Sequence, residues 1–235
     1  NFWQYVDYFS PWHGAETVGT PTQPDDPIVQ DTTGRDFEYG LLNIPNPAYT
    51  NAAHKNGVKS IGCIFLPRTG QPSADMLEQD ENGGFPVADK LIEIAEYYGF
   101  DGYFINQEES IPSENVKIYK QFTKYLIDHG LYLQWYDSLK PSGSLSYQNE
   151  LNENNATFIQ DTEYGLGKVN SSLFVNYDWF RSSGGETKAE KSLQYAADNG
   201  IDPFAEVFFG VEANQGKFSG SHGSALHLGY IYQPG

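Results

Sequence analysis

The sequence has 235 residues, of which 39% are hydrophobic and 15% aromatic, and its formal net charge is −17. This composition buries a substantial core, which argues against a disordered chain. The negative charge repels phosphate backbones and anionic lipid, which argues against nucleic acid and membrane surfaces as partners. The longest apolar run, residues 61–67, is too short to cross a bilayer.

A repeated order of amphipathic helix, glycine and short apolar strand organises the chain. The expected elements, in order, are a strand at 3–9, a helix at 48–55 and a strand at 58–66, a helix at 86–98 and a strand at 103–105, a helix at 113–129 and a strand at 131–136, a strand at 173–177, and a helix at 186–198 with a strand at 204–209. Capping glycines stand at 57, 99, 130 and 200. This alternation predicts a parallel sheet with helical crossovers.

Two α/β architectures satisfy this pattern: an open doubly wound sheet and a closed (β/α)₈ barrel of the TIM type. No Gly-x-Gly-x-x-Gly follows an early strand, which weakens the dinucleotide-binding version and favours the barrel. Only six strands are visible, whereas the barrel needs eight. Either the strand assignment is incomplete, or the chain lacks a strand at each end. We expect residues 1–235 to form one barrel domain that is truncated at both ends.

In such a barrel the reacting groups gather at the carboxyl ends of the strands. Polar and aromatic residues stand at these predicted ends: Asp7, Trp12, Arg68, Asn106, Glu108, Gln134, Tyr136, Asp137, Asn176, Trp179, Glu212 and Asn214. Aromatic rings beside amides and carboxylates suit a sugar, and they equally suit a buried aromatic core with hydroxyl partners.

The most informative stretch is residues 103–108, YFINQE. Strand alternation places Asn106 and Glu108 on one face, with their heads roughly 7 Å apart. Glycosidic bond cleavage needs an acid for the leaving oxygen and a group that meets the developing positive charge. An amide cannot be that nucleophile, but it can hold a sugar N-acetyl group whose own carbonyl oxygen attacks. The residues alone leave open the alternative in which Asn106 caps the strand and Glu108 pairs with a lysine.

The stretch 103–108 also resembles the catalytic-strand motif of glycoside hydrolase family 85, the endo-β-N-acetylglucosaminidases. Further segments are similar to other parts of that family: 2–7 (FWQYVD), 52–58 (AAHKNGV), 62–67 (GCIFLP), 135–138 (WYDS) with 148–149 (QN), and 174–179 (FVNYDW). Together they cover most of the chain in the family's order.

This resemblance implies a (β/α)₈ barrel that cleaves N-linked glycans between the two core N-acetylglucosamine residues. It implies that Glu108 is the general acid and then the base, and that Asn106 orients the 2-acetamido group that forms an oxazolinium intermediate. Tyr136 would bind near the same acetamide, and Trp179 would wall the sugar subsite. Water would then give hydrolysis, and a sugar acceptor would give transglycosylation. The other candidate substrate contacts are Trp12, Trp135, Asp137, Asn176 and Glu212.

Departures from the family pattern leave two rival functions open. Glu212 stands where the family would have an aspartate after the seventh strand. A two-carboxylate retaining glycosidase would pair Glu108 with Glu212. A non-catalytic barrel would bind glycans through the same aromatic residues without turnover.

The remaining expectations concern cofactors, partners and location. The histidines form no helical His-x-x-x-His pair and do not combine with the single cysteine, so no metal site and no cofactor are expected. Cys63 is predicted to be a core residue, and Glu109 to be solvated. The expected partners are N-linked glycans or glycoproteins. A secreted or cell-surface location is favoured and the cytoplasm stays open, as does the oligomeric state.

Overall fold

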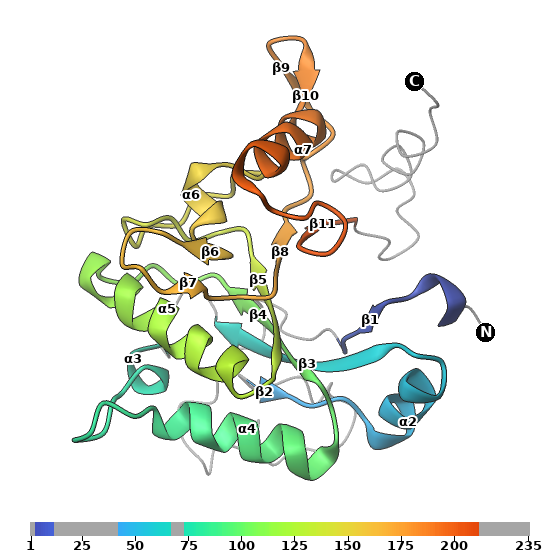
Figure 1. Ribbon diagram of the computed structural model, residues 1–235, viewed down its shortest axis with the longest axis vertical. Helices are drawn as coiled ribbons and strands as arrows, with labels where there is room; N and C mark the ends of the chain where they lie inside the picture. The colour runs from blue at the N-terminus through green and yellow to red at the C-terminus, as the bar shows by residue number, and fades with distance from the viewer. Residues whose placement is uncertain (1–2, 12–41, 67–72, 212–235) are drawn as a thin grey trace, which may run out of the picture.

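The computed structural model describes residues 3–11, 42–66 and 73–211 (Figure 1). Its main sheet has six strands in parallel order: β1 (Tyr8–Phe9), β3 (Lys59–Leu66), β4 (Gly102–Gln107), β5 (Tyr132–Tyr136), β8 (Ser172–Val175) and β11 (Val207–Phe209). A seventh strand, β2 (Leu42–Asn43), pairs with β3 in antiparallel orientation. The six parallel strands match the six predicted from the sequence.

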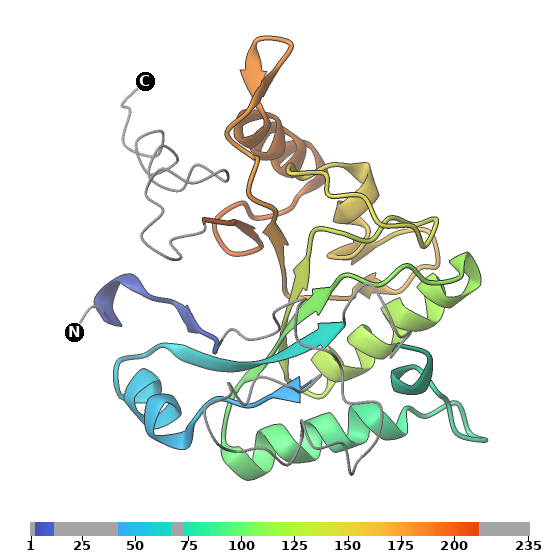
Figure 2. The same ribbon diagram turned by 180° about the vertical axis from the view of Figure 1, so that it is seen from behind.

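Helices connect successive parallel strands and lie around the outside of the sheet (Figures 1 and 2). They are α2 (Pro47–Lys55), α3 (Ser73–Met76), α4 (Pro86–Tyr98), α5 (Ser113–Asp128), α6 (Glu153–Ala156) and α7 (Lys188–Asn199). Two hairpins, β6 (Gln160–Asp161) with β7 (Gly167–Lys168) and β9 (Ser182–Ser183) with β10 (Glu186–Thr187), accompany the later connections.

The sheet curls until its first and last strands approach each other. The Tyr8 ring of β1 stacks on the Tyr132 ring of β5, with centroids 4.3 Å apart. The same Tyr8 ring meets the edge of Phe208 on β11 at 5.6 Å. Within the described residues β1 and β11 form no ladder, so this part of the chain is an incomplete TIM-type barrel, as the sequence predicted. The absence of a strand at each end of the chain stays a prediction.

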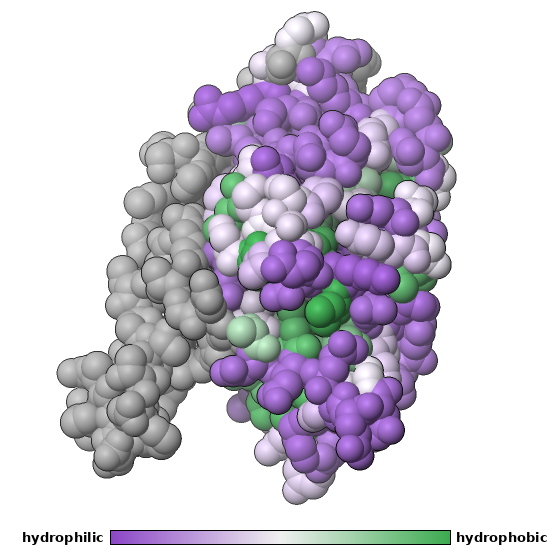
Figure 3. Space-filling model, turned by 90° about the vertical axis from the view of Figure 1, so that its left-hand side faces the viewer, coloured by the Kyte–Doolittle hydropathy of each residue, from purple (hydrophilic) through white to green (hydrophobic). Residues whose placement is uncertain are grey.

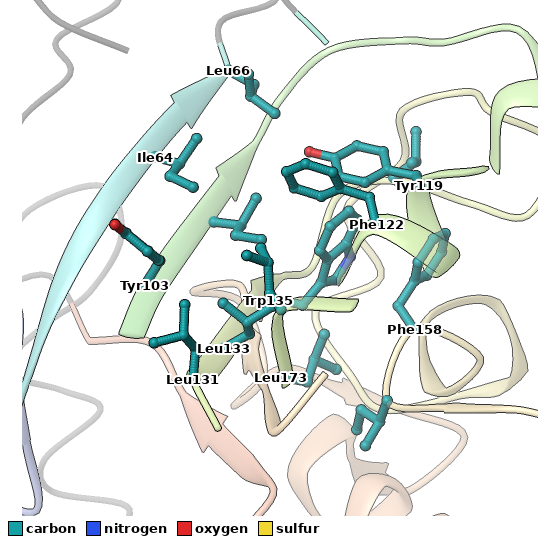
Figure 4. Close-up of a cluster of buried hydrophobic side chains, with 14 of the residues drawn as sticks. Ile64, Leu66, Tyr103, Tyr119, Phe122, Leu131, Leu133, Trp135, Phe158 and Leu173 are labelled. Carbon is teal, nitrogen blue, oxygen red and sulfur yellow. The ribbon is translucent and has the colours of Figure 1, made fainter. Parts of the chain in front are cut away.

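Side chains alternate between the two faces of the sheet and form two cores. The larger one lies between the strands and the helices, where Trp135 of β5 stacks on Phe158 and meets Tyr119 of α5 edge-on (Figure 4). The smaller one fills the barrel interior with Ile61, Cys63, Phe104 and Tyr136. Cys63 is fully buried, which confirms its predicted role in the core.

The helix ends follow the sequence signals closely. Gly99 and Gly200 cap α4 and α7 in the left-handed conformation, with φ of 73° and 68°. At the start of α7, the side chains of Thr187 and Glu190 form a reciprocal capping box. Helix α5 begins at Ser113, as predicted, with Pro112 at its N-cap.

Two predicted strands are shorter than expected. Residues Trp3–Tyr5 form a 3₁₀ turn, and β1 pairs with β3 only at Lys59 and Ser60, because β2 takes the carboxyl half of the same edge. Phe204 is 90% exposed in a turn, where the Asp202 carboxylate accepts its backbone N–H at 2.9 Å. The last strand therefore begins only at residue 207.

The outer surface of the helical layer is mainly hydrophilic, with hydrophobic side chains showing between polar ones (Figure 3). In the part of the chain that the structure describes, no helix combines the length and the apolar character needed to cross a bilayer.

A buried ion pair joins α5 to the β6–β7 hairpin. Lys120 Nζ lies 2.7 Å from Asp161 Oδ1, and both side chains are inaccessible to solvent. Burial alone would raise the pKa of Asp161, but hydrogen bonds from Lys120 and from the Leu166 backbone hold that pKa below its usual value. The stabilisation from this depressed pKa is therefore present at neutral pH and is lost as the pH falls below about 4.

We predict that Asp161→Asn lowers the free energy of unfolding by about 3 to 5 kcal/mol, because it leaves the Lys120 ammonium buried without its counter-charge. Urea denaturation measures this loss. The matched control is Asp128→Asn in the exposed pair Lys124–Asp128, where the change should stay below about 0.5 kcal/mol. Equal effects of the two substitutions would show that the buried pair does not carry this stability.

Candidate active site

Asn106 and Glu108 meet at the carboxyl end of β4, on the face that lines the barrel interior. Asn106 is 1% exposed, and its Nδ2 donates a hydrogen bond to Glu108 Oε2 at 3.3 Å. Glu108 is half-buried. From the strand rise, the sequence predicted a distance of roughly 7 Å between the head groups of the two side chains. The side chains instead converge, so the amide and the carboxylate form one unit.

The backbone around Glu108 is held from both neighbouring strands. Its N–H donates to the carbonyl of Leu66 on β3 at 2.8 Å. The preceding residue, Gln107, points to the helical side, where its Oε1 accepts from Tyr119 at 3.3 Å. The Ser138 hydroxyl, just after β5, donates to the Gln107 carbonyl. These contacts leave the Glu108 side chain directed to the interior.

A second tyrosine that the sequence analysis did not single out also contacts the carboxylate. The Tyr147 hydroxyl donates to Glu108 Oε1 at 2.5 Å from the loop that follows β5. Its ring lies against Tyr136, with centroids 5.9 Å apart. One sequence feature could have identified Tyr147: it directly precedes Gln148 and Asn149, which are part of the resemblance to family 85.

Tyr136 and Asn176, which the sequence placed at the carboxyl ends of two strands, are in contact with each other. The Tyr136 hydroxyl donates to Asn176 Oδ1 at 2.9 Å, and Asn176 Nδ2 donates to Asn149 Oδ1 at 2.9 Å. Burial raises the pKa of Tyr136 far above its ordinary value, so its hydroxyl keeps the proton that it donates to Asn176. A sugar contact by either residue stays a prediction.

Asp137 is 1% exposed, and its carboxylate accepts four hydrogen bonds from other parts of the protein. Its Oδ1 accepts hydrogen bonds from Gln148 N at 3.2 Å and Asn155 Nδ2 at 2.9 Å. Its Oδ2 accepts from Asn149 N at 2.7 Å and Asn176 N at 3.4 Å. Burial raises its pKa, although these four donors oppose the rise. Protein donors thus occupy both carboxylate oxygens of Asp137, and the predicted contact of this residue with the sugar stays a prediction.

Two tryptophans predicted to contact the sugar lie in the helical core. Trp135 is 1% exposed and faces α5, on the side of β5 opposite to Tyr136. Trp179 is 5% exposed, packs on Phe209, and donates its indole N–H to the Gly210 carbonyl at 2.7 Å. Each ring is buried against other side chains of the protein, and its predicted contact with the sugar stays a prediction.

Three further residues complete the comparison with the sequence. Trp12 and Glu212 lie outside the described residues. Glu109, expected to be solvated, is 2% exposed and accepts from the Ser73 backbone N–H at 3.0 Å. Burial raises its pKa. The expectation was wrong because the chain after β4 passes under α3 instead of into solvent.

The described site thus offers one partly exposed carboxyl group with an amide beside it. The neighbouring carboxylates, Asp137 and Glu109, are both buried and bonded to protein donors. Among the described residues no cluster of three or more histidine, cysteine, aspartate or glutamate side chains could hold a metal ion. An acidic side chain at the carboxyl end of a barrel strand stands where a glycoside hydrolase of this fold can hold its general acid.

The family comparison agrees with this class. The model for glycosyl hydrolase family 85 matches residues 1–230. The chain belongs to this family.

Relatives of this chain carry the corresponding enzyme names. A cytosolic endo-beta-N-acetylglucosaminidase of Danio rerio is 34% identical over 183 residues, which are 75% of this chain and 24% of that protein. The Homo sapiens protein of the same name is 31% identical over 180 residues, 73% of this chain and 22% of that protein. The chain therefore spans about a quarter of the length of these relatives.

A solved structure shows a similar fold. The glycoside hydrolase domain of Endo-D from Streptococcus pneumoniae R6 matches with a TM-score of 0.63 and 32% identity. The match covers 77% of this chain and 29% of that chain.

We predict that Asp137→Asn lowers the free energy of unfolding by about 1 to 3 kcal/mol, because an amide NH₂ must then face a donor that the carboxylate accepted. The amide protons of Gln148 and Asn149 should also exchange faster with solvent. Urea denaturation and hydrogen exchange measure the two effects.

The matched control is Asp80→Asn, since Asp80 accepts two backbone N–H groups in an exposed loop. Its effect should be about 0.5 kcal/mol or less. Unchanged protection of residues 148 and 149 in Asp137→Asn would show that another group holds this loop.

Proposed function

We propose that the protein is an endo-β-N-acetylglucosaminidase that hydrolyses the GlcNAc-β-1,4-GlcNAc bond in the core of N-linked glycans. The observation that carries this proposal is the contact between Asn106 Nδ2 and Glu108 Oε2 at the end of β4, in a chain of family 85. The names of the matched relatives and of Endo-D support the same activity.

The proposed reaction starts with a proton on Glu108. Glu108 donates this proton to the leaving glycosidic oxygen as the bond to the anomeric carbon breaks. The 2-acetamido carbonyl oxygen attacks the same carbon from the opposite face, and Asn106 holds the acetamide in place. The product is an oxazolinium ion with a net positive charge on the ring. In this proposal the neutral Tyr136 hydroxyl also binds near the acetamide.

The second step restores the enzyme. Glu108, now a carboxylate, takes a proton from water as the water oxygen attacks the anomeric carbon and the oxazolinium ring opens. Two inversions retain the configuration at that carbon. A sugar hydroxyl in place of water would give transglycosylation by the same atom movements.

The burial of neighbouring carboxylates favours this route over a two-carboxylate mechanism. Within the described ranges, neither Asp137 nor Glu109 presents a free oxygen to a sugar on the interior face. The rival mechanism requires Glu212 and would trap a covalent sugar ester on it, whereas the proposed mechanism forms no such ester.

The substrates and the location follow from the same assignment. The partners proposed for the protein are N-linked glycans on peptides or proteins, and the names of the relatives favour the cytoplasm over the secreted location expected from the sequence.

We predict that Glu108→Gln loses at least about 10³-fold in release of a glycan ending in one N-acetylglucosamine from an N-glycopeptide, because no other described acid replaces it. Chromatography of the released glycan measures turnover. Glu114→Gln, an exposed glutamate at the start of α5, serves as the control and should keep full activity.

Undiminished turnover by Glu108→Gln would contradict the assignment. Wild-type protein that binds the glycopeptide without cleaving it over long incubation would instead identify a glycan-binding barrel.

We also predict that Asn106→Gln loses hydrolysis of the glycopeptide but still transfers a preformed sugar oxazoline to an acceptor. Only oxazoline formation needs the amide of Asn106, whereas Glu108 still activates the acceptor. Mass spectrometry of the transfer product measures the second activity. Parallel loss of both activities would argue against the role given to Asn106.

A further inference from the structure

We propose that Tyr147 is a positioning residue that keeps the transferable proton of Glu108 on Oε2. This inference rests on the proposed function and deepens it. Its basis is the hydrogen bond from the Tyr147 hydroxyl to Glu108 Oε1 at 2.5 Å, opposite the Asn106 contact on Oε2.

The two donors distinguish the two carboxyl oxygens. The Tyr147 bond to Oε1, at 2.5 Å, is much shorter than the Asn106 bond to Oε2, at 3.3 Å. The carbonyl oxygen of a protonated carboxyl group is its stronger acceptor, so the shorter bond favours the carbonyl at Oε1 and the proton on Oε2. Oε2 faces Asn106, which holds the acetamide in the proposed reaction. The acid proton and the attacking carbonyl oxygen thereby meet the same anomeric centre from its two opposite faces, the proton at the leaving oxygen and the carbonyl oxygen at the carbon. The proton leaves Oε2 for the glycosidic oxygen, and water returns a proton to Oε2.

The hydroxyl of Tyr147 is held in place by its loop. Asn149 Nδ2 donates to the Tyr147 carbonyl at 3.1 Å, and the Asn149 backbone N–H donates to Asp137 at 2.7 Å. The Tyr147 ring rests against Tyr136 on β5. The buried Asp137 carboxylate therefore sets the place of the loop, and the loop sets the place of the hydroxyl.

The test is Tyr147→Phe, which keeps the ring contact and removes only the donor. Two substrates carrying the same glycan are compared: an N-glycopeptide, whose leaving oxygen needs the proton, and a nitrophenyl glycoside, whose phenolate leaves without it. We expect kcat on the glycopeptide to fall about tenfold or more, as for a lost hydrogen bond to a charged group, with KM changed less than about twofold. On the nitrophenyl glycoside kcat should fall less than about threefold.

The pH–rate profile gives an independent readout. If the Tyr147 hydroxyl acts on Glu108, Tyr147→Phe should displace the alkaline limb of the glycopeptide profile, whereas a merely structural role would leave that limb where it is in the wild type. The matched control is Tyr125→Phe, which deletes a hydroxyl that donates to the exposed Asp89 carboxylate at 2.7 Å on the helical surface. This control should leave both rates and the profile unchanged.

Equal losses on both substrates, or no loss on either, would overturn the role of Tyr147 while leaving the proposed function intact. A wild-type protein that cleaves neither substrate would overturn the proposed function itself, and the assignment of Tyr147 with it.

Discussion

The buried carboxylate of Asp137 is the constraint on which the site depends. A carboxylate that is removed from water is costly unless hydrogen-bond donors surround it. Asp137 meets this requirement with four donors, from residues 148 and 149, from Asn155 at the start of α6, and from Asn176 after β8. Because these donors belong to three segments, satisfying one carboxylate brings together the whole loop after β5 and the end of β8.

These hydrogen bonds reach the proposed catalytic pair, Asn106 and Glu108, through short chains of contacts. The loop places Tyr147 on Glu108, and Asn149 holds Asn176, which in turn accepts from Tyr136. On the other side, β4 supplies both members of the pair from its interior face while Tyr103 and Ile105 anchor the same strand in the helical core. β4 and β5 thus each place core residues on one face and residues of the proposed site on the other.

Much of this arrangement was predictable from periodicity. The order of helices and strands, the glycine caps, the shared face of Asn106 and Glu108, and the interior position of Tyr136 all follow from local sequence. The same alternation places Trp135 opposite Tyr136, on the side of β5 that packs against α5. The sequence placed Trp179 and Asp137 at strand ends but did not show their burial, which depends on packing against Phe209 and on the loop at residues 148–149.

Tyr147 could not be predicted in the same way. Its contact with Glu108 spans 39 residues and depends on a loop whose path is set by hydrogen bonds to Asp137 and not by helical or strand periodicity. Local patterns predict which faces of regular elements meet, and they do not predict the path of a loop that side-chain donors determine. The distance between the head groups of Asn106 and Glu108 is also shorter than the strand rise predicted, because side-chain torsions bring the two groups together.

The central claim is that the acetamide of the substrate, held by Asn106, is the nucleophile. It is tested most directly by turnover of nitrophenyl glycosides of the same glycan in which the 2-acetamido methyl carries zero, one, two or three fluorines. Each fluorine makes the carbonyl oxygen a weaker nucleophile without changing the leaving group. The account predicts that kcat/KM falls steeply with each fluorine added. A rate independent of fluorine number would show that another group attacks the anomeric carbon, and would contradict the account.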